Sequence, residues 1–318
     1  MIVMKTIDNN SNIFIEALEK NDISLIKRIS KAEFHNHSAL GCDRKLLTKH
    51  GVLIPKLEEI NSIEEMDAFS KKYVSRFTKT EEGFKLLIEN AVISAIDDGI
   101  VILETSIDFR FFKFFNNPEE GLIFLENLIQ KYKDKISLRY DIGLSRKSYN
   151  NQFEKLTIEL IDSGIFSGMD IYGDESYNDL SKFKDIYKYG KNMGMKLKAH
   201  VGEFGTADDV KDTIKYLDLD VVQHGINIVS SKENMNYAKE KGIVFNVCPT
   251  SNVVLKRAKN FNEHPIRIMY DMGLDVTINT DDLLIFNSTL SDEYLKLYNN
   301  KVFNAEELNK IRIKSLNY

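Results

Sequence analysis

Cysteine and proline are both scarce in this chain. Its 318 residues include two cysteines, Cys42 and Cys248, and four prolines. Two cysteines are too few for a disulfide framework or for a zinc site built from cysteine ligands, so we expect a reduced, cytoplasmic protein. No stretch rich in proline, glycine or serine separates one part of the sequence from another. We therefore predict that residues 1–318 form a single domain, with residues 1–30 as an N-terminal helical extension.

The chain also lacks an excess of positive charge. Its 43 lysines and arginines are outnumbered by 48 acidic residues, the net charge is −5, and no basic stripe is present. This composition argues against nucleic acid as a partner. No apolar segment is long enough to cross a bilayer, and Met1–Ile13 lacks the basic start and apolar run of a signal peptide, so no membrane association is expected.

Short strand-like runs alternate with longer helical patterns, which is typical of a parallel sheet built from βα units. Several runs are almost continuously apolar, as strands covered on both faces should be. The predicted strands are Lys31–His35, Ile100–Ile107, Ser137–Ile142, Gly164–Tyr172, Met195–His200, Asp218–Gln223, Ile243–Val247 and Asp275–Asn279. Strands of this number, alternating with helices, predict an α/β fold: a (β/α)₈ TIM barrel with an extra N-terminal helix.

The helical patterns have recognisable ends. Thr206 and Asp209 form a capping-box-like pair that opens one helix, and Pro265 opens another. Apolar residues three and four positions apart predict a helix over Glu82–Asp97. The segment Asn12–Ile29 is expected to form the additional helix before the first strand.

Four of the six histidines fall in short polar stretches that follow predicted strands. The stretches are His35-Asn36-His37, His200 with Glu203, His224-Gly225 and Asp281-Asp282. Taken singly, each has an ordinary explanation, because buried histidines often bond to backbone carbonyls and adjacent acids often cap a helix. Together they follow strands one, five, six and eight, whose C-terminal ends meet at the active-site face of a barrel. We therefore expect these side chains to converge on one site.

The residue types in this expected site suit a metal ion. His35 and His37 are two positions apart on a strand, so both imidazoles point to the same side. Three imidazoles and one carboxylate suit a catalytic zinc that keeps a position for water and lowers the pKa of that water to roughly 7. The fourth strand, Gly164–Tyr172, contains no lysine that could bridge two metals, so one zinc ion per chain is predicted.

The other polar residues of these stretches suit acid/base chemistry. Glu203 can donate a proton to a substrate, His224 can accept one from the water, and Asp282 can form a hydrogen bond with the substrate. The two remaining histidines, His50 and His264, are assigned to structure. The run Cys248-Pro249-Thr250-Ser251-Asn252 is expected to be a turn after the seventh strand, with Cys248 packed in the interior.

Five segments carry a resemblance to a known family. They are Lys31-Ala32-Glu33-Phe34-His35-Asn36-His37, Asp170-Ile171-Tyr172-Gly173-Asp174-Glu175, His200-Val201-Gly202-Glu203, His224-Gly225 and Asn279-Thr280-Asp281-Asp282. In order, spacing and strand placement they resemble the signature of the adenosine deaminase family of metal-dependent hydrolases. The resemblance extends from about Lys31 to the C-terminus.

This resemblance implies the hydrolytic deamination of a 6-aminopurine, with a small purine nucleoside, adenosine, as the leading substrate and inosine and ammonia as products. The ligands of the zinc ion that it implies are His35, His37, His200 and Asp281. Its implied catalytic residues are Glu203, which protonates N1, His224, which orients and deprotonates the attacking water, and Asp281. Its implied substrate contacts are Asp282 at N7 and the backbone N–H of Gly173 at N3. Glu203 would need a raised pKa for this role, and desolvation in a closed pocket would provide one.

One departure from the family pattern concerns the sugar. The family usually follows its second histidine with Leu-Asp-Gly, whose aspartate contacts the 5′-hydroxyl, whereas this chain has Ser38-Ala39-Leu40. Ala39 cannot accept a hydrogen bond, so adenosine held another way, a modified adenosine or AMP, and free adenine all remain candidate substrates. Two further alternatives are a barrel hydrolase that acts on another C–N or ester bond and a catalytically silent barrel that binds a purine.

Overall fold

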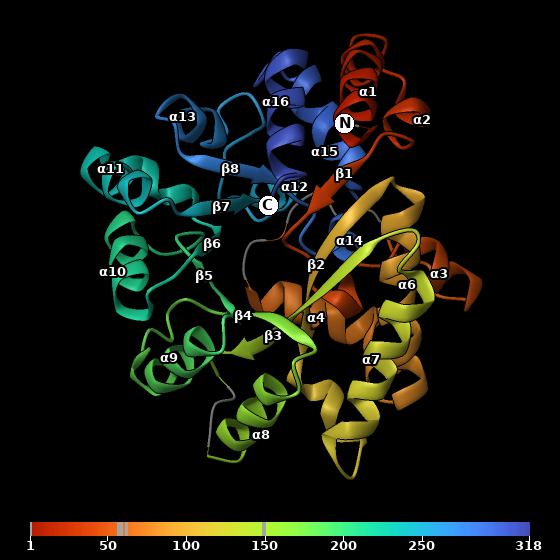
Figure 1. Cartoon of the computed structure of the whole chain (residues 1–318), viewed down its shortest axis with the longest axis vertical. Coiled ribbons are helices and arrows are strands. Elements are labelled where there is room, and N and C mark those ends of the chain that lie inside the picture. The colour runs from red at the N-terminus through yellow and green to blue at the C-terminus, as the bar shows by residue number, and fades with distance from the viewer. Residues whose placement is uncertain (1, 56–59, 61–62, 148–150) are drawn as a thin grey trace.

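Eight parallel strands form the centre of the computed structural model, which describes residues 2–55, 60, 63–147 and 151–318 (Figure 1). The strands pair in chain order, so each lies beside its sequence neighbours. Within the described ranges they are β1 Lys31–Glu33, β2 Ile100–Asp108, β3 Ser137–Ser145, β4 Phe166–Tyr172, β5 Lys196–Val201, β6 Val221–His224, β7 Val244–Val247 and β8 Asp275–Ile278. The predicted α/β barrel is confirmed, with strand ends that differ from the prediction by up to three residues.

The last strand meets the first through a few individual hydrogen bonds. The side chain of Asn279 accepts a hydrogen bond at 2.8 Å from the backbone just after β1, and the N–H of Asp281 donates to the carbonyl of His35 at 3.1 Å. The N–H of Thr280 donates to the buried carboxyl of Glu33 at 2.8 Å. These bonds close the barrel and hold the segments that carry His35 and Asp281 side by side.

Helices surround the strands (Figure 1). Four of the described α-helices come between β1 and β2 in the sequence. The helices are α1 Ile2–Glu19, α2 Ile23–Ile26, α3 Arg44–Lys49, α4 Ile63–Tyr73, α5 Ser75–Thr78, α6 Glu81–Asp97, α7 Pro118–Tyr132, α8 Asn151–Asp162, α9 Lys184–Asn192, α10 Ala207–Leu217, α11 Lys232–Glu240, α12 Pro249–Val254, α13 Ile266–Asp271, α14 Leu283–Phe286, α15 Leu290–Asn299 and α16 Ala305–Ser315. Short 3₁₀ helices are η1 Ser38–Leu40, η2 Phe109–Phe114, η3 Ser181–Phe183 and η4 Ile226–Ser230.

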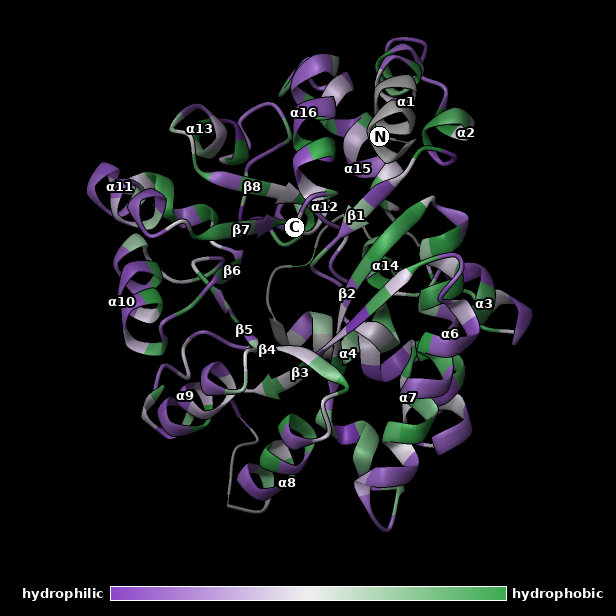
Figure 2. Cartoon of the chain, in the orientation of Figure 1, coloured by the Kyte–Doolittle hydropathy of each residue, from purple (hydrophilic) through white to green (hydrophobic). Residues whose placement is uncertain are grey.

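The outer helices bury one side against the barrel. In α10 the buried residues include Val210, Ile214 and Leu217, which are spaced three and four positions apart. The helix begins with the predicted capping box, in which Thr206 and Asp209 each accept a hydrogen bond from the other's backbone N–H. Figure 2 shows the same division: β2 is largely hydrophobic, whereas α10 and α11 mix hydrophobic and hydrophilic residues.

The N-terminal extension is not the single helix Asn12–Ile29 that the sequence predicts. The chain breaks between α1 and α2 because Asn21 adopts a left-handed conformation, with φ of 54°, and Asp22 caps the start of α2. Phe14 of α1 packs edge-on against Tyr294 of α15, with ring centroids 5.3 Å apart. The extension therefore lies against the helices from the C-terminal part of the chain.

A buried ion triad occupies the barrel interior. Nζ of Lys198 lies 2.6 Å from Oε2 of Glu104 and 2.6 Å from Oδ2 of Asp141, and all three side chains are buried. Lys198 and His200 are two positions apart on β5, so they point to the same side of the strand. The triad therefore lies within the barrel, one layer of side chains below His200.

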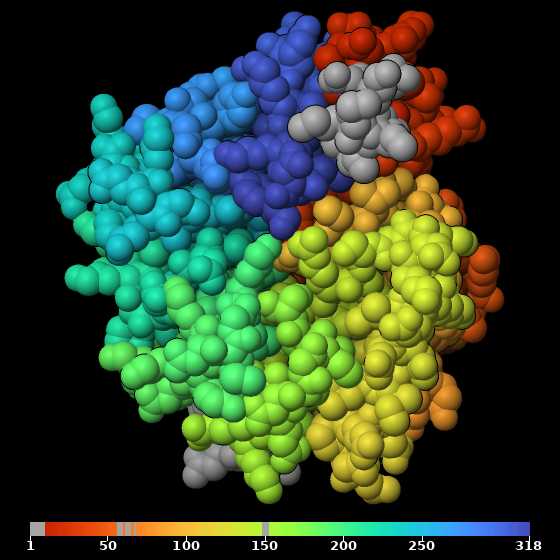
Figure 3. Space-filling view, viewed as in Figure 1, coloured from red at the N-terminus to blue at the C-terminus, as the bar shows by residue number. Residues whose placement is uncertain are grey.

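The C-terminal end of the chain covers the opposite end of the barrel from the strand-end histidines. Tyr318 packs against Phe34, with ring centroids 6.1 Å apart, and its hydroxyl donates to Asp275, the first residue of β8, at 3.2 Å. The C-terminal residues are visible on the face that Figure 3 shows. Among the described residues, no helix combines the length and the apolar composition that a membrane crossing needs.

Candidate metal centre and active site

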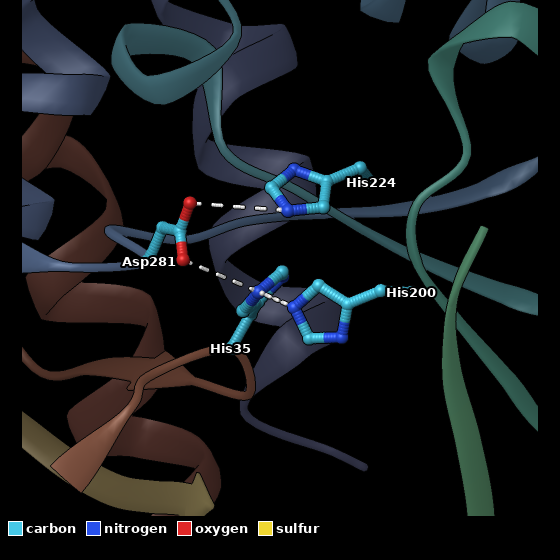
Figure 4. A group of neighbouring side chains, drawn as sticks. All are labelled: His35, His200, His224 and Asp281. Carbon is cyan, nitrogen blue, oxygen red and sulfur yellow. Dashed lines mark hydrogen bonds and ion pairs between the residues drawn. The ribbon is translucent and has the colours of Figure 1, made fainter. Parts of the chain in front are cut away.

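Four side chains from the ends of four strands converge at the C-terminal face of the barrel. They belong to His35, His200, His224 and Asp281, and each offers a ligand atom within 4.8 Å of the others (Figure 4). All four side chains are buried. The convergence that the sequence predicts for these segments is therefore present.

His37 joins the same cluster from its edge. Its Nε2 lies 3.2 Å from Nε2 of His200 and 3.3 Å from Oδ1 of Asp281. Nε2 of His35 lies 3.0 Å from Nε2 of His200 and 3.6 Å from Oδ1 of Asp281. Ligand atoms that share one tetrahedral zinc at about 2.0–2.2 Å lie roughly 3.3–3.6 Å apart. The measured pairs, at 3.0–3.6 Å, are at or slightly below this separation, so His37 lies close enough to the group of Figure 4 to contribute to the same metal site.

The protonation of two imidazoles supports this fit. Nδ1 of His35 faces the carbonyl of Asn246 at 3.2 Å, and Nδ1 of His200 faces a carboxylate oxygen of Asp170 at 3.1 Å. Both partners can only accept, so each Nδ1 carries a hydrogen, and in the neutral ring each Nε2 presents a lone pair. Burial also lowers the pKa of His35 well below its ordinary value, which favours the neutral ring. Two lone pairs 3.0 Å apart cannot form a hydrogen bond, but they can share a cation.

Local backbone conformation directs two of the side chains inward. His224 and Asp281 both adopt left-handed φ values, 60° and 62°. Residues other than glycine rarely adopt this region, and such strain is concentrated at functional sites. His224 ends β6 and Asp281 lies just past β8, so both turns occur where the strands leave the barrel. The strain is consistent with side chains that must reach a common centre.

Glu203 lies next to His224 in the same site. Its Oε2 is 3.6 Å from Nε2 of His224, and its Oε1 is 3.3 Å from the amide nitrogen of Asn252. The side chain is buried, and burial together with the charge of Asp281 raises the pKa of Glu203 well above its ordinary value. The raised pKa favours the protonated form of the carboxyl group, which an acid catalyst needs.

Residues of the cluster line a pocket with a volume of about 620 Å³; they are His37, His200, Glu203, His224 and Asp281. Asp282 and Gly173 also line it, and Gly173 adopts a φ of 99° that favours glycine. Asp282 stands at the start of α14, but its side chain makes no capping bond there, so the simple explanation of adjacent acids as helix caps does not hold. Burial and the neighbouring Asp281 raise the pKa of Asp282 to about 8. Ala39 lines the pocket as well, from η1.

The structure adds residues that the sequence did not identify. Asp170 of β4 accepts from His200 at 3.1 Å and from the hydroxyl of Ser106 at 2.9 Å, so it fixes the orientation of that imidazole. Ser251 donates to Oδ2 of Asp281 at 2.7 Å, and Asn252 lies 3.1 Å from Nδ1 of His224. The sequence did contain a signal for Asp170, because an acidic residue within an apolar strand indicates a buried polar role.

The sequence prediction was wrong for the segment that contains Ser251 and Asn252. Residues Pro249–Val254 form the short helix α12 instead of a turn, because Pro249 starts a helix readily and the chain continues in helical geometry. Cys248 precedes this helix and is buried, as expected. The helix presents its first turn to the site, which brings small polar side chains beside His224 and Asp281.

Comparisons with known proteins agree on one family. The family model described as adenosine deaminase matches residues 51–318. An adenosine deaminase of Plasmodium knowlesi is 30% identical over 336 residues, which cover 96% of this chain and 90% of that protein. An adenine deaminase of Psychrobacter cryohalolentis is 26% identical over 307 residues, which cover 90% of this chain and 91% of that protein.

Solved structures show the same fold at lower identity. An adenine deaminase from Arthrobacter aurescens superposes with a TM-score of 0.75 at 21% identity, covering 90% of this chain and 93% of that one. An amidohydrolase from Burkhoderia ambifaria with bound zinc has a TM-score of 0.73 at 18% identity, covering 92% of this chain and 86% of that one. The N6-methyl-AMP deaminase of Arabidopsis thaliana has a TM-score of 0.72 at 18% identity, covering 92% of each chain.

Proposed function

The chain belongs to the adenosine deaminase family, whose members are hydrolases of C–N bonds, and we propose that it deaminates a 6-aminopurine with the help of one zinc ion. Adenosine is the proposed substrate, with inosine and ammonia as products. The observation that carries the proposal is the buried Glu203, whose pKa is raised, next to His224 in the same site as the other converging imidazoles and Asp281. A ring nitrogen that gains charge during attack at C6 needs such an acid.

His35, His37, His200 and Asp281 would hold the zinc ion. When bound, the ion would supply a Lewis acid and lower the pKa of a water molecule at neutral pH. A donor set of three imidazoles and one carboxylate suits zinc, and a related barrel contains zinc. Asp170 would stabilise this arrangement through its hydrogen bond with Nδ1 of His200, which fixes the orientation of that ring.

The other residues would bind the purine and transfer protons. Glu203 donates a proton to N1, and His224 accepts a proton from the attacking water. The proton on His224 passes to the amino group, which leaves as ammonia. The second proton of the water returns to Glu203 as C6 becomes a carbonyl, so the acid is regenerated. Asp282 would contact N7, and the N–H of Gly173 would contact N3.

The end of the pocket that would hold the sugar decides which 6-aminopurine compound is the substrate. A volume of about 620 Å³ is within the range of pockets that hold nucleoside-sized ligands. Ala39 leaves this end without the acid that the family usually has there. Adenine, or a modified adenosine or AMP, is therefore the alternative substrate, and relatives named for adenine and N6-methyl-AMP exist.

A substrate panel tests the proposal. Purified protein with measured zinc content is incubated with adenosine, adenine, AMP and N6-methyl-AMP, and the release of ammonia or methylamine is recorded. We expect the highest kcat/KM with adenosine. Protein that contains one zinc ion per chain and releases no amine from any of these compounds would contradict the proposed function. The variant His200→Ala should lose zinc, and an unchanged metal content would contradict its assignment as a ligand.

The variant Ala39→Asp tests the alternative substrates. A carboxylate at this position adds one acceptor for a sugar hydroxyl, which should raise kcat/KM for adenosine relative to adenine by roughly tenfold. The same charge should repel a phosphate and lower kcat/KM for AMP. If the variant leaves kcat/KM for adenosine, adenine and AMP unchanged, the sugar does not occupy the space beside Ala39.

A further inference from the structure

Glu175 makes an unusual set of contacts with the loop that carries Glu203. Its Oε2 accepts from the N–H of Gly202 at 2.7 Å and of Gly205 at 3.0 Å. Its Oε1 accepts from the N–H of Glu203 at 2.9 Å and of Phe204 at 2.9 Å. A carboxylate has about four acceptor positions, so one side chain binds the backbone of four consecutive residues. We propose that Glu175 is a positioning residue that holds the Gly202–Gly205 loop in the conformation that presents Glu203 to the substrate.

The opposite side of the loop is held by Asn227, at the start of the 3₁₀ helix after β6. Its side-chain amide donates to the carbonyl of Glu203 at 3.2 Å and of Gly205 at 2.7 Å. Its backbone N–H donates to the carbonyl of Gly202 at 2.9 Å. The loop is thus bound through its N–H groups on one side and through carbonyl groups on the other.

The two glycines of the loop are suited to this arrangement. A Cβ on Gly205 would lie 2.7 Å from Oε2 of Glu175, so the carboxylate would have to shift. Gly202 has a φ of 75°, which favours glycine, and its N–H makes the shortest of the four bonds to Glu175. Gly205 therefore leaves room for the carboxylate, whereas a Cβ on Gly202 would collide with Val210.

The position of Glu203 depends strongly on this backbone. Its carboxyl oxygens lie 3.3 Å from Asn252 and 3.6 Å from His224, which are long contacts that constrain the side chain only weakly. The loop also separates Glu203 from His200 by only two residues, so it links the proposed acid to a proposed zinc ligand. Charge-assisted bonds to backbone N–H groups are among the stronger hydrogen bonds. The carboxylate of Glu175 is therefore well placed to set where the acid lies.

Glu175 also connects two sides of the proposed substrate site. It follows β4, two residues after Gly173, whose N–H is the proposed contact for N3 of the purine. The inference rests on the proposed function, because it concerns the delivery of a proton to that purine. It adds a role for a residue that touches neither the purine nor the metal in the proposed mechanism.

The variant Glu175→Gln tests the role of the carboxylate. A carboxamide has one acceptor oxygen, so two of the four N–H groups would face an NH₂ group in either orientation. We expect hydrogen exchange of the Gly202–Gly205 amides to accelerate roughly tenfold or more. A misplacement of about 1 Å costs on the order of 10²-fold in rate, so kcat should fall by about that factor while KM stays within about threefold. Zinc content should be unchanged.

Two further variants make the experiment specific. Glu175→Asp keeps both oxygens and the charge, so it should recover part of the lost kcat. Asp292→Asn removes a carboxylate that accepts a backbone N–H at 3.0 Å at the start of α15, away from the site, and should leave kcat unchanged. Unchanged exchange and kcat in Glu175→Gln would overturn the inference. So would a parallel loss of zinc, or an equal fall of kcat in Asp292→Asn. If the native protein deaminates no purine, the proposed function fails, whereas the exchange measurement still tests the contact of Glu175 with the loop.

Discussion

Replacing Glu203 with glutamine removes a transferable proton and preserves most other properties of the side chain. Glu203 is 6% exposed, and burial raises its pKa well above the ordinary value, which favours the neutral carboxylic acid. Glutamine has the same shape and the same zero charge. The free energy of unfolding should therefore change by less than about 1 kcal/mol, and the zinc content should stay the same. In contrast, kcat should fall by roughly 10²–10⁴-fold, which corresponds to about 3–5 kcal/mol of activation free energy.

Amine release by Glu203→Gln, measured with the best substrate of the panel, checks this expectation. Glu233→Gln is the matched control, because it makes the same substitution at a surface carboxylate whose side chain is 81% exposed. A kcat close to that of the native protein, at full zinc content, would show that the proton comes from another group. A loss of zinc in Glu203→Gln would show that the carboxyl group supports the metal instead of the substrate.

Three further predictions concern residues around the site and in the core. Asp170→Asn should weaken zinc binding by about 10–100-fold, because it alters the group that accepts a hydrogen bond from Nδ1 of His200. Competition with a chelator measures this affinity, and a native value would refute the prediction. Lys198→Met leaves the buried Asp141 without its cation and leaves Glu104 with Arg139 and Lys196. The free energy of unfolding should fall by about 3–5 kcal/mol, and a smaller loss in chemical denaturation would count against the triad. Burial lowers the pKa of His264 from 6.5 to about 3, so the unfolded state binds more protons between these values and stability should fall as the pH drops from about 6.5 toward 3. His264→Asn should reduce this dependence in thermal unfolding, and an identical pH dependence would contradict the assignment.

The sequence predicted the barrel and its convergent site because both depend on repeated, local signals. Apolar runs marked the strands, and the topology of a barrel brings strand ends together whatever the intervening helices do. The residues His35, His200 and Asp281 could therefore be placed at one site before any contact was known. The break at Asn21 was missed because it lies inside an amphipathic pattern that reads as one continuous helix.

Residues that act through another side chain were harder to predict. Asn252 lies in a run of small polar residues, and only the helix α12 brings it against His224. Glu175 was part of a segment that resembles the family, but nothing in its neighbours along the chain indicates bonds to residues 27–30 positions away. Such contacts arise from the adjacency of β4 and β5, and they become visible only when the two loops are seen together.

The seam between β1 and β8 has a consequence for how the protein matures. The bond between Thr280 and Glu33 joins positions 247 residues apart, and the proposed ligands His35 and Asp281 lie on either side of the same seam. During translation, the first histidines leave the ribosome long before the aspartate that completes the coordination shell is synthesised. If these proposed ligands hold the metal, we expect tight uptake only by a nearly finished polypeptide, and an early-terminated product should lack the ion.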